Sequence, residues 1–352
     1  MKKTIAVLFG GYSPEYSISL KSAYAVLTHM DCEKYQIIPV GITRDGRWFR
    51  YLGEYERILN DTWHDHPNLC RAAFLSPDRS VHGLCEVTGN SLTFTWIDAV
   101  FPVLHGKNGE DGTVQGLAQA AGIPVVGCGA MSSALSMDKY RAHLLAEAAG
   151  VKAPKAIHLT QQLSGSQLME EVSHLSYPLF VKPLRAGSSF GITKVTDPSA
   201  LSGAAELAFQ YDSEIIIEEN IDGFEVGCAV LGSSHLTLGR VDEIELGCGF
   251  FDYTEKYTQE TARIHMPARI DAEKEAEIQK AAVKIYRILG CSGFARVDLF
   301  LTAHGEIVFN EVNTIPGFTA VSRYPNMLKG VGMGYGEIIE ALLTDALEKE
   351  ES

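Results

Sequence analysis

The feature that most constrains the fold is a continuous apolar run near the start of the chain, Thr4–Phe9, which stops at Gly10-Gly11. A run without alternating polar residues predicts a strand buried on both faces, as in a parallel sheet. Ser13-Pro14-Glu15 then predicts the N-cap and the first two positions of a helix that reaches about Leu27. This beginning predicts an open α/β sheet that binds its ligands at the C-terminal ends of the strands.

The same alternation of strands and helices continues through residues 1–130. Further strands are predicted at Tyr35–Ile42, Ile97–Leu104 and Pro124–Val126, and a helix is predicted at Thr113–Ala121. Residues 43–95 are interpreted as an irregular segment with a small β excursion. This order predicts an N-terminal parallel sheet with helical connections.

Two further units are predicted at 131–215 and 216–352, because a chain of 352 residues exceeds one simple core. The first unit contains a helix at Met137–Ala149, a hairpin formed by Leu179–Lys182 and Ile192–Val195, and a strand at Ile215–Glu219. The second contains strands at Glu225–Leu231, Val297–Leu301 and Ile307–Asn310, and a helix at Ala272–Leu289. Residues 246–262 form a long polar-aromatic loop, and such loops are typically lids or binding loops.

Composition excludes several classes of function. The 30 lysines and arginines against 44 acidic residues give a net charge of −14, which does not favour binding to nucleic acid. Seven scattered cysteines without a CxxC spacing predict reduced thiols in a cytoplasm. The N-terminal apolar run is too short for a signal peptide, and no stretch approaches the roughly 18 apolar residues of a membrane span.

One group of residues has the chemistry of a metal site. Asp298 lies in a strand-like run, and Glu311 and Asn313 are two residues apart, so their side chains share one face of an extended chain. Two carboxylates and an amide oxygen form a hard oxygen site with positions left for phosphates and water, as Mg²⁺ prefers. A solvated edge strand with exposed acids is the alternative interpretation.

Two other segments suit a nucleotide. Lys182 ends a strand and precedes the small residues of Ala186–Gly191, so an ammonium and backbone N–H groups could meet a phosphate. Glu218, Glu219 and Glu225 flank a turn and could accept an adenine amine and ribose hydroxyls. The first segment could equally be a hairpin tip, and the second could be the charged flanks of strands.

Two turns complete the set. The segment 105–112 follows an apolar strand directly, at the sheet edge where ligands bind, although a lone His such as His105 is more often a surface or hydrogen-bonded residue. Asn313–Thr319 contains a Pro-Gly turn beside the predicted metal ligands, which could place hydroxyl and amide donors near a reacting carbonyl. An ordinary turn before the C-terminal helix is the alternative.

In this order and in this strand pattern, the five segments resemble the ATP-grasp superfamily and, more narrowly, the D-alanine–D-alanine ligase family. The resemblance runs from Gly10 to about Leu343, and its signatures are HGKNGEDGT, SALSMDKYRAH, KPLRAGSSFGITKV, EIELGCGFFDYTEKY and FNEVNTIPGFT. It implies an α/β ATP-grasp fold of three domains. These are an N-terminal parallel α/β domain at 1–130, a central α+β subdomain at 131–215, and a C-terminal α+β subdomain at 216–352 with the metal site and a mobile loop at 246–262.

The resemblance also implies an ATP-dependent carboxylate–amine ligase that forms a peptide bond, ADP and phosphate. Its cofactors would be ATP and two Mg²⁺ ions, for which Mn²⁺ can substitute. The implied catalytic residues are Glu15, Ser188, Tyr257 and Arg296. The implied substrate-binding residues are His105, Phe251, Gly317, Ser322 and Arg323. The implied nucleotide-binding residues are Lys139, Lys182, Ser189, Glu218, Glu219, Ile221, Glu225 and Lys256. The implied metal ligands are Asp298, Glu311 and Asn313.

Two positions differ from the housekeeping members of that family. Phe251 stands where they usually carry Tyr, and Arg323 stands where they usually carry an aliphatic residue. Both changes resemble the vancomycin-resistance ligases, and Glu255-Lys256-Tyr257 in place of a His motif resembles the D-alanine–D-serine ligases of the VanG type. A hydroxyl on the second substrate needs room and a polar partner, which Phe251 and Arg323 would supply.

The expected function is therefore an ATP-dependent D-alanine–D-serine ligase that makes a peptidoglycan precursor dipeptide through a D-alanyl phosphate and confers vancomycin resistance. A housekeeping D-alanine–D-alanine ligase is the main alternative. D-Lactate use and a non-catalytic nucleotide-binding regulator are the others. The resemblance also implies a cytoplasmic homodimer whose small-molecule partners are ATP, D-alanine and D-serine, and we expect neither nucleic acid nor a membrane as a partner.

Overall fold

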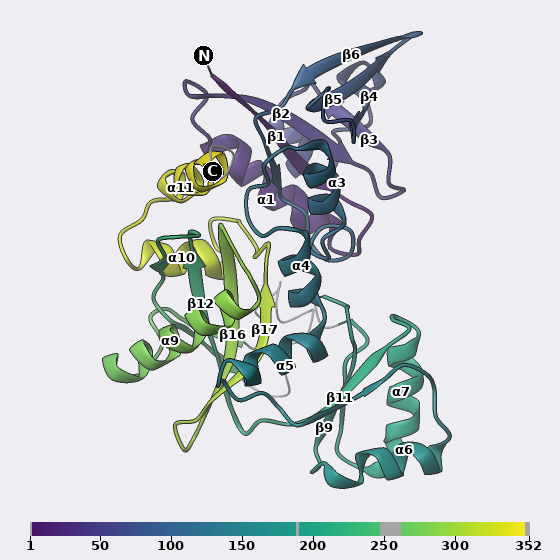
Figure 1. The fold of residues 1–352 in the computed structure, drawn as a ribbon, viewed down its shortest axis with the longest axis vertical. Coiled ribbons are helices and arrows are strands. Elements are labelled where there is room, and N and C mark those ends of the chain that lie inside the picture. The colour runs from purple at the N-terminus through teal and green to yellow at the C-terminus, as the bar shows by residue number, and fades with distance from the viewer. Residues whose placement is uncertain (1, 188–189, 247–261, 349–352) are drawn as a thin grey trace.

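The computed structural model describes residues 2–187, 190–246 and 262–348. The chain forms three sheets of seven, four and six strands. Figure 1 shows the N-terminal sheet at one end of the long axis, the four-stranded sheet at the other end, and the six-stranded sheet between them. These layers are those of the ATP-grasp fold that the sequence predicted.

The N-terminal sheet begins with the predicted buried strand. β1 (Lys3–Gly10) pairs in parallel with β2 (Tyr35–Ile42) and with β7 (Ala99–Pro102). The prediction for residues 43–95 is wrong, because this segment extends the sheet by four antiparallel strands and adds one short α-helix and one 3₁₀ helix. These elements are β3 (Trp48–Tyr51), α2 (Tyr55–Leu59), η1 (Pro67–Leu69), β4 (Cys70–Leu75), β5 (Gly83–Thr88) and β6 (Ser91–Trp96).

The turn after β1 differs from the predicted helix start. α1 (Tyr16–His29) begins two residues later than expected, since the Ser13 hydroxyl accepts the N–H of Glu15 at 3.1 Å instead of capping the helix. Gly10 takes a φ of +85°, which a side chain would strain, and the N–H of Gly11 donates to the carbonyl of Ile42 at 2.8 Å. The turn leaves Glu15 at the C-terminal edge of the sheet.

The helix predicted at Met137–Ala149 forms as α5 (Lys139–Ala148), within two residues of the expected bounds. A further helix that was not predicted, α4 (Ala130–Met137), precedes it and is separated from it by Asp138. The Asp138 carboxylate accepts the N–H of Arg141 at 3.0 Å and so caps α5. α3 (Thr113–Ala121) forms as predicted, whereas the predicted strand Pro124–Val126 is reduced to an isolated bridge between Val100 and Val125.

The four-stranded sheet is antiparallel, in the order β10-β9-β11-β8. The predicted hairpin is confirmed, because β9 (Leu179–Pro183) pairs with β10 (Thr193–Val195). β11 (Ile215–Glu219) lies beside β9 and sets Ile216 opposite Lys182. The remaining elements of this unit are β8 (Ala156–Leu159), α6 (Gly165–Glu171), η2 (Val172–His174), η3 (Pro198–Ala200) and α7 (Leu201–Phe209).

The six-stranded sheet is built on the long antiparallel pair of β12 (Gly223–Leu231) and β16 (Phe294–Thr302). β17 (Ile307–Asn313) lies on the other side of β16, and α9 (Ala272–Ile288) packs against β12 and β16. The other elements are β13 (Thr237–Leu238), β14 (Asp242–Leu246), β15 (Ala262–His265), α10 (Arg323–Lys329) and α11 (Tyr335–Glu348). In Figure 1, α11 returns to the N-terminal sheet, where its apolar side chains join the same core as β1.

The helices in the described ranges are all too short or too polar to cross a membrane. None of the six cysteines within these ranges forms a disulfide. The predicted domain boundaries near residues 130 and 215 stay a prediction.

A cluster of aromatic rings joins the N-terminal and C-terminal units. The Phe294 ring lies edge-on to Phe101 of β7, with centroids 6.4 Å apart, and to Phe318 at 5.9 Å. Tyr324 of α10 completes the cluster at 5.7 Å from Phe294. Because these rings are buried and come from both units, they fix the position of the C-terminal sheet against β7.

Replacing Phe294 with Ala should lower the free energy of unfolding by about 3–5 kcal/mol, because a buried ring is removed and a cavity remains. Urea unfolding followed by fluorescence measures the change. Phe94→Ala serves as the control, since the Phe94 side chain is 59% exposed on an edge strand, and its effect should stay within about 0.5 kcal/mol. Equal losses in the two variants would contradict the proposed contribution of the cluster.

Candidate active site

Two cavities adjoin one another where the three units meet. The first, of 270 Å³, is lined by residues from all three units, and the second, of 470 Å³, lies between the central and C-terminal sheets. Lys139, Glu225 and Glu311 line both cavities, so a ligand in one would reach the other. The predicted residues that line only the first are Glu15, His105, Arg296, Asn313, Gly317, Ser322 and Arg323. Those that line only the second are Lys182, Glu218, Glu219 and Ile221.

The second cavity carries the two predicted phosphate lysines. Both are buried, Lys139 as the first residue of α5 and Lys182 near the end of β9. Lys139 Nζ donates to the carbonyl of Ala186 at 2.9 Å, and Lys182 Nζ forms an ion pair with Glu218 Oε1. Glu218 Oε2 is buried and accepts no hydrogen bond within the described structure, so it is an acceptor that suits a donor group of a bound nucleotide.

The three predicted metal ligands lie together across two neighbouring strands. Asp298 of β16 is the register partner of Glu311 of β17, and Asn313 Nδ2 donates to Asp298 Oδ2 at 2.9 Å. This bond leaves the amide oxygen of Asn313 as a further acceptor. The described residues contain no group of three or more His, Cys, Asp and Glu side chains that could hold a metal. Two carboxylates and an amide oxygen are hard donors, and they fit a divalent cation that takes its remaining ligands from phosphates and water.

Arg296 occupies the substrate side of this group. Its Nε and Nη2 lie 2.8 and 2.7 Å from the two oxygens of Asp298, a fork-like pairing in which both groups are largely buried. Burial lowers the pKa of Arg296, but the charge and hydrogen bonds of Asp298 together with the charge of Asp242 outweigh it, and the pKa is raised. A fixed cation therefore faces the first cavity, where an oxyanion could be stabilised.

Arg323 is a second buried cation in the same wall. Its Nε and Nη2 donate to the two oxygens of Asp242, each at 2.8 Å, and its Nη1 donates to Glu225 at 2.9 Å. Burial lowers the pKa of Arg323, but Asp242 and Asp298 raise it well above its ordinary value. The predicted polar wall is thus a guanidinium held in place by carboxylates.

Asp242 was not predicted as a site residue, although it shapes this wall. Its side chain is fully buried, and it also accepts the N–H of Gly227 at 3.1 Å. The signal in the sequence was an acid at the first position of the strand Asp242–Leu246, one residue before the EIEL signature. A buried acid in a strand needs a compensating cation, which Arg323 supplies from 81 residues away.

His105 lines the first cavity, and it is a buried histidine whose two ring nitrogens both have hydrogen-bond partners. Its Nδ1 lies 3.0 Å from the carbonyl of Ile315, and its Nε2 lies 3.2 Å from the Ser22 hydroxyl. Since a carbonyl only accepts, Nδ1 carries the proton and Nε2 accepts from Ser22. Burial lowers the pKa of His105 to about 4, so the ring is neutral at pH 7.

Glu110 is a second site residue that the sequence did not predict. Its carboxyl group accepts the N–H groups of Gly106 at 2.8 Å and Ile315 at 3.1 Å, and it lines the first cavity. Burial raises its pKa to about 8, with a further contribution from the charge of Glu15. The sequence feature that could have indicated Glu110 is its position in the segment HGKNGEDGT.

Two glycines let the Glu15 carboxylate approach the backbone of two other segments, one of them in the central unit. A Cβ atom at Gly106 would lie 2.0 Å from Glu15 Oε2, and one at Gly187 would lie 2.9 Å from the same oxygen. Glu15 therefore lies against both the segment after β7 and the segment after β9. This contact brings a predicted catalytic residue of the N-terminal unit to the phosphate-binding unit.

Five predicted residues lie outside the described residues, as does the predicted loop apart from its end positions. They are Ser188, Ser189, Phe251, Lys256 and Tyr257.

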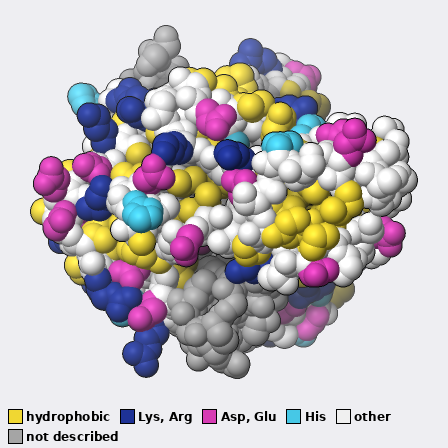
Figure 2. Space-filling view, turned by 90° about the horizontal axis from the view of Figure 1, so that it is seen from below, with side chains coloured by type: hydrophobic (Ala, Val, Ile, Leu, Met, Phe, Trp, Pro, Cys, Tyr) yellow, Lys and Arg dark blue, Asp and Glu magenta, His cyan; other side chains and the backbone are white. Residues whose placement is uncertain are grey.

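On the face shown in Figure 2, acidic and basic side chains are interspersed, and the basic ones do not gather into one patch of the kind that binds nucleic acid.

Comparison with known proteins identifies relatives of this arrangement. Family models described as the D-ala D-ala ligase N-terminus and C-terminus match residues 4–128 and 145–344. The chain is 43% identical to a D-alanine–D-alanine ligase of Caldicellulosiruptor bescii, over 99% of this chain and 96% of that protein. It is also 43% identical to the vancomycin/teicoplanin A-type resistance protein VanA of Enterococcus faecium, over 98% of each chain.

The fold is similar to that of the VanG D-Ala:D-Ser ligase from Enterococcus faecalis, with a TM-score of 0.91 and 56% identity over 98% of this chain and 99% of that one. The chain belongs to the D-alanine–D-alanine ligase family. As a member of this family it is an ATP-dependent ligase that joins a carboxylate to an amine. Apart from Asp298, the residues that the family resemblance implied and that the structure describes line two adjoining cavities of the ligase.

His105 should make the stability of the ligase depend on pH in mildly acidic solution. Between pH 4 and 6.5 the unfolded chain binds a proton at His105 that the folded chain does not, so stability falls as the pH falls through this window. His105→Gln should therefore lose less unfolding free energy than the wild type between pH 6.5 and 4.5, as measured by urea unfolding. The control is His235→Gln, at an exposed loop position. Identical pH profiles for His105→Gln and the wild type would disprove the assignment.

Proposed function

We propose that the chain is an ATP-dependent D-alanine–D-serine ligase that forms its dipeptide through a D-alanyl phosphate intermediate. The observation that carries the proposal is the pair of adjoining cavities, one with the nucleotide and phosphate residues and one walled by Arg296 and Arg323. The 56% identity to a protein named as a D-Ala:D-Ser ligase supports the choice of substrate. The proposal extends to a peptidoglycan precursor that confers vancomycin resistance, and to a cytoplasmic homodimer.

The first step, transfer of the terminal phosphate of ATP to a carboxylate, requires positive charge in the site. A carboxylate that attacks the terminal phosphate of ATP meets like charge, which Lys139 and Lys182 reduce. Divalent cations, when bound by Asp298, Glu311 and Asn313, would neutralise more of that charge. Glu15 holds the ammonium of the first D-alanine so that its carboxylate faces the phosphate.

The second step needs stabilisation of an oxyanion. When the amine of the second amino acid attacks the acyl phosphate, negative charge develops on the carbonyl oxygen. Arg296 and the N–H of Gly317 are the donors that we assign to this oxygen, and both residues line the first cavity. Ser322 lines the same cavity and is assigned to the carboxylate of the second substrate.

The preference for D-serine is assigned to the polar wall around Arg323. A serine hydroxyl that enters an apolar pocket loses its hydrogen bonds to water, whereas the Arg323 guanidinium and its carboxylate partners can replace them. Asp242 keeps the guanidinium in place through two bonds of 2.8 Å. The housekeeping D-alanine–D-alanine ligase stays the second candidate, because one hydroxymethyl group changes preference only modestly.

With ATP, Mg²⁺ and equimolar D-alanine and D-serine, the wild-type product should be mostly D-Ala–D-Ser, measured by mass spectrometry. Arg323→Leu should shift the ratio of D-Ala–D-Ser to D-Ala–D-Ala by roughly tenfold towards D-Ala–D-Ala. The ratio does not depend on how much of the variant is folded, which matters because the change leaves Asp242 unpaired. Predominant D-Ala–D-Ala from the wild type would refute the D-serine assignment.

Glu311→Gln keeps the shape of the side chain but removes one negative charge from the metal ligands. We expect ADP release in the presence of D-alanine to fall by roughly 100-fold, in the range of other losses of transition-state charge stabilisation. Chelation with EDTA should stop the wild-type reaction, and Mg²⁺ or Mn²⁺ should restore it. Glu306→Gln, on the exposed turn before β17, is the matched control and should leave the rate unchanged. Unaltered turnover in Glu311→Gln would argue against this metal site.

A further inference from the structure

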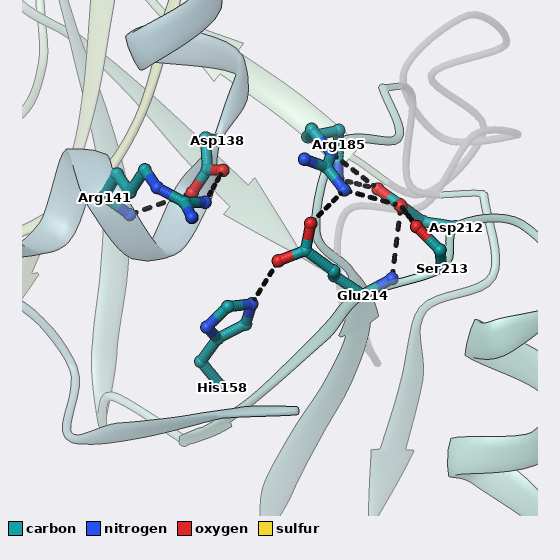
Figure 3. Close-up of polar contacts among 7 residues, drawn as sticks. All are labelled: Asp138, Arg141, His158, Arg185, Asp212, Ser213 and Glu214. Carbon is teal, nitrogen blue, oxygen red and sulfur yellow. Dashed lines mark hydrogen bonds and ion pairs between the residues drawn. The ribbon is translucent and has the colours of Figure 1, made fainter. Parts of the chain in front are cut away.

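A group of charged side chains surrounds the start of the glycine-rich segment, outside both cavities (Figure 3). Arg185 lies two residues after the end of β9. Its Nε and Nη2 lie 3.2 and 3.0 Å from the two oxygens of Asp212, and its own N–H donates to Asp212 at 2.9 Å. Nη2 also donates to Glu214 Oε1 at 2.6 Å. One planar side chain is thus fixed at several points to the segment that precedes β11.

Glu214 continues the connection towards α5. Its other oxygen, Oε2, lies 2.7 Å from Nε2 of His158 on β8, as Figure 3 shows. The His158 ring stacks on Tyr140, with centroids 4.8 Å apart and planes inclined by 26°. Tyr140 is the neighbour of Lys139 in the chain, so the contacts lead from Arg185 to the helix that carries a phosphate lysine.

A second set of contacts holds the same segment of the chain. Lys139 Nζ donates to the carbonyl of Ala186, the residue after Arg185, at 2.9 Å. The N–H of Leu184 donates to the carbonyl of Glu214 at 3.0 Å. The chain from Leu184 to Ala186 is therefore held from the α5 side and from the β11 side at the same time.

We infer that Arg185, Asp212, Glu214 and His158, here called the Arg185 cluster, are positioning residues that hold Lys139 and the Ala186-Gly187 backbone in the geometry that receives the terminal phosphates of ATP. The inference rests on the proposed function. The forked pairing with Asp212 and Glu214, whose side chains are 11% and 20% exposed, also stabilises the fold, so the test below separates that contribution from positioning. What the cluster fixes is the relative position of two segments that adjoin the phosphate site.

Arg185→Ala should weaken binding in proportion to the phosphates of the ligand. Isothermal titration with Mg²⁺ should give a dissociation constant at least tenfold higher for a non-hydrolysable ATP analogue, a smaller rise for ADP, and a change within twofold for adenosine, whose pocket at Glu219 and Ile221 is untouched. Arg185→Lys keeps the charge without the fork and should lose part of the same affinity. His158→Phe keeps a ring against Tyr140 and should also lose part.

Arg71→Ala is the matched control, because Arg71 forms an ion pair with Glu86 in the N-terminal sheet, outside both cavities, and its side chain is 51% exposed. It should bind all three ligands as the wild type does. Equal weakening for the ATP analogue, ADP and adenosine in Arg185→Ala would show a merely structural contribution and overturn the inference. Unchanged binding of the ATP analogue in both Arg185 variants would overturn it as well. A wild-type protein that binds no nucleotide would overturn the proposed function together with the inference.

Discussion

The active site depends on one buried carboxylate, Asp298. Its two oxygens receive the guanidinium of Arg296, the amide of Asn313 and, at 3.4 Å, a nitrogen of Arg323. A charge that is 1% exposed is costly unless it is paired, so these partners cannot be removed singly without leaving a buried charge. Because Asp298 contacts Arg296, Asn313 and Arg323, which we assign to the oxyanion, the metal and the second substrate, a change in any of them alters the surroundings of the others.

The charges around Asp298 come from distant parts of the chain, and the fold brings them together through antiparallel register. β12 pairs with β16 along nine residues, which sets Gly227 opposite Asp298 and places β14 with Asp242 on the far side of β12. The missing side chain of Gly227 leaves the space that Arg323 occupies, since a Cβ there would lie 2.4 Å from Nη2 of Arg323. The specificity wall therefore needs a glycine on one strand, an acid on the next and an arginine at the start of α10.

Local spacing allowed some of this site to be predicted, and burial explains the rest. Glu311 and Asn313 were predictable because residues two apart share a face of a strand, and their place opposite Asp298 and Arg296 confirms the shared face. Asp242 and Glu110 were missed because an acid in a buried position is recognised only by its partners, which lie far along the chain. The helix α4 was not predicted, and the start of α5 was placed two residues early because a capping Asp looks like an ordinary polar residue of the helix. The four strands within 43–95 were missed since short half-exposed strands carry a weak pattern.

Burial also determines which charges remain near the first substrate. His105 and Glu110 both lie against the Ile315 backbone, and removal from water disfavours the charged form of each. At pH 7 the imidazole is neutral, and the Glu110 carboxyl group, with a pKa of about 8, is mostly protonated. The charge of Glu15 is one cause of that raised pKa, so the two acids share a site in which one of them stays ionised. Glu15 lies beside the glycines that admit its carboxylate, and it is the group that we assign to the ammonium of the first substrate.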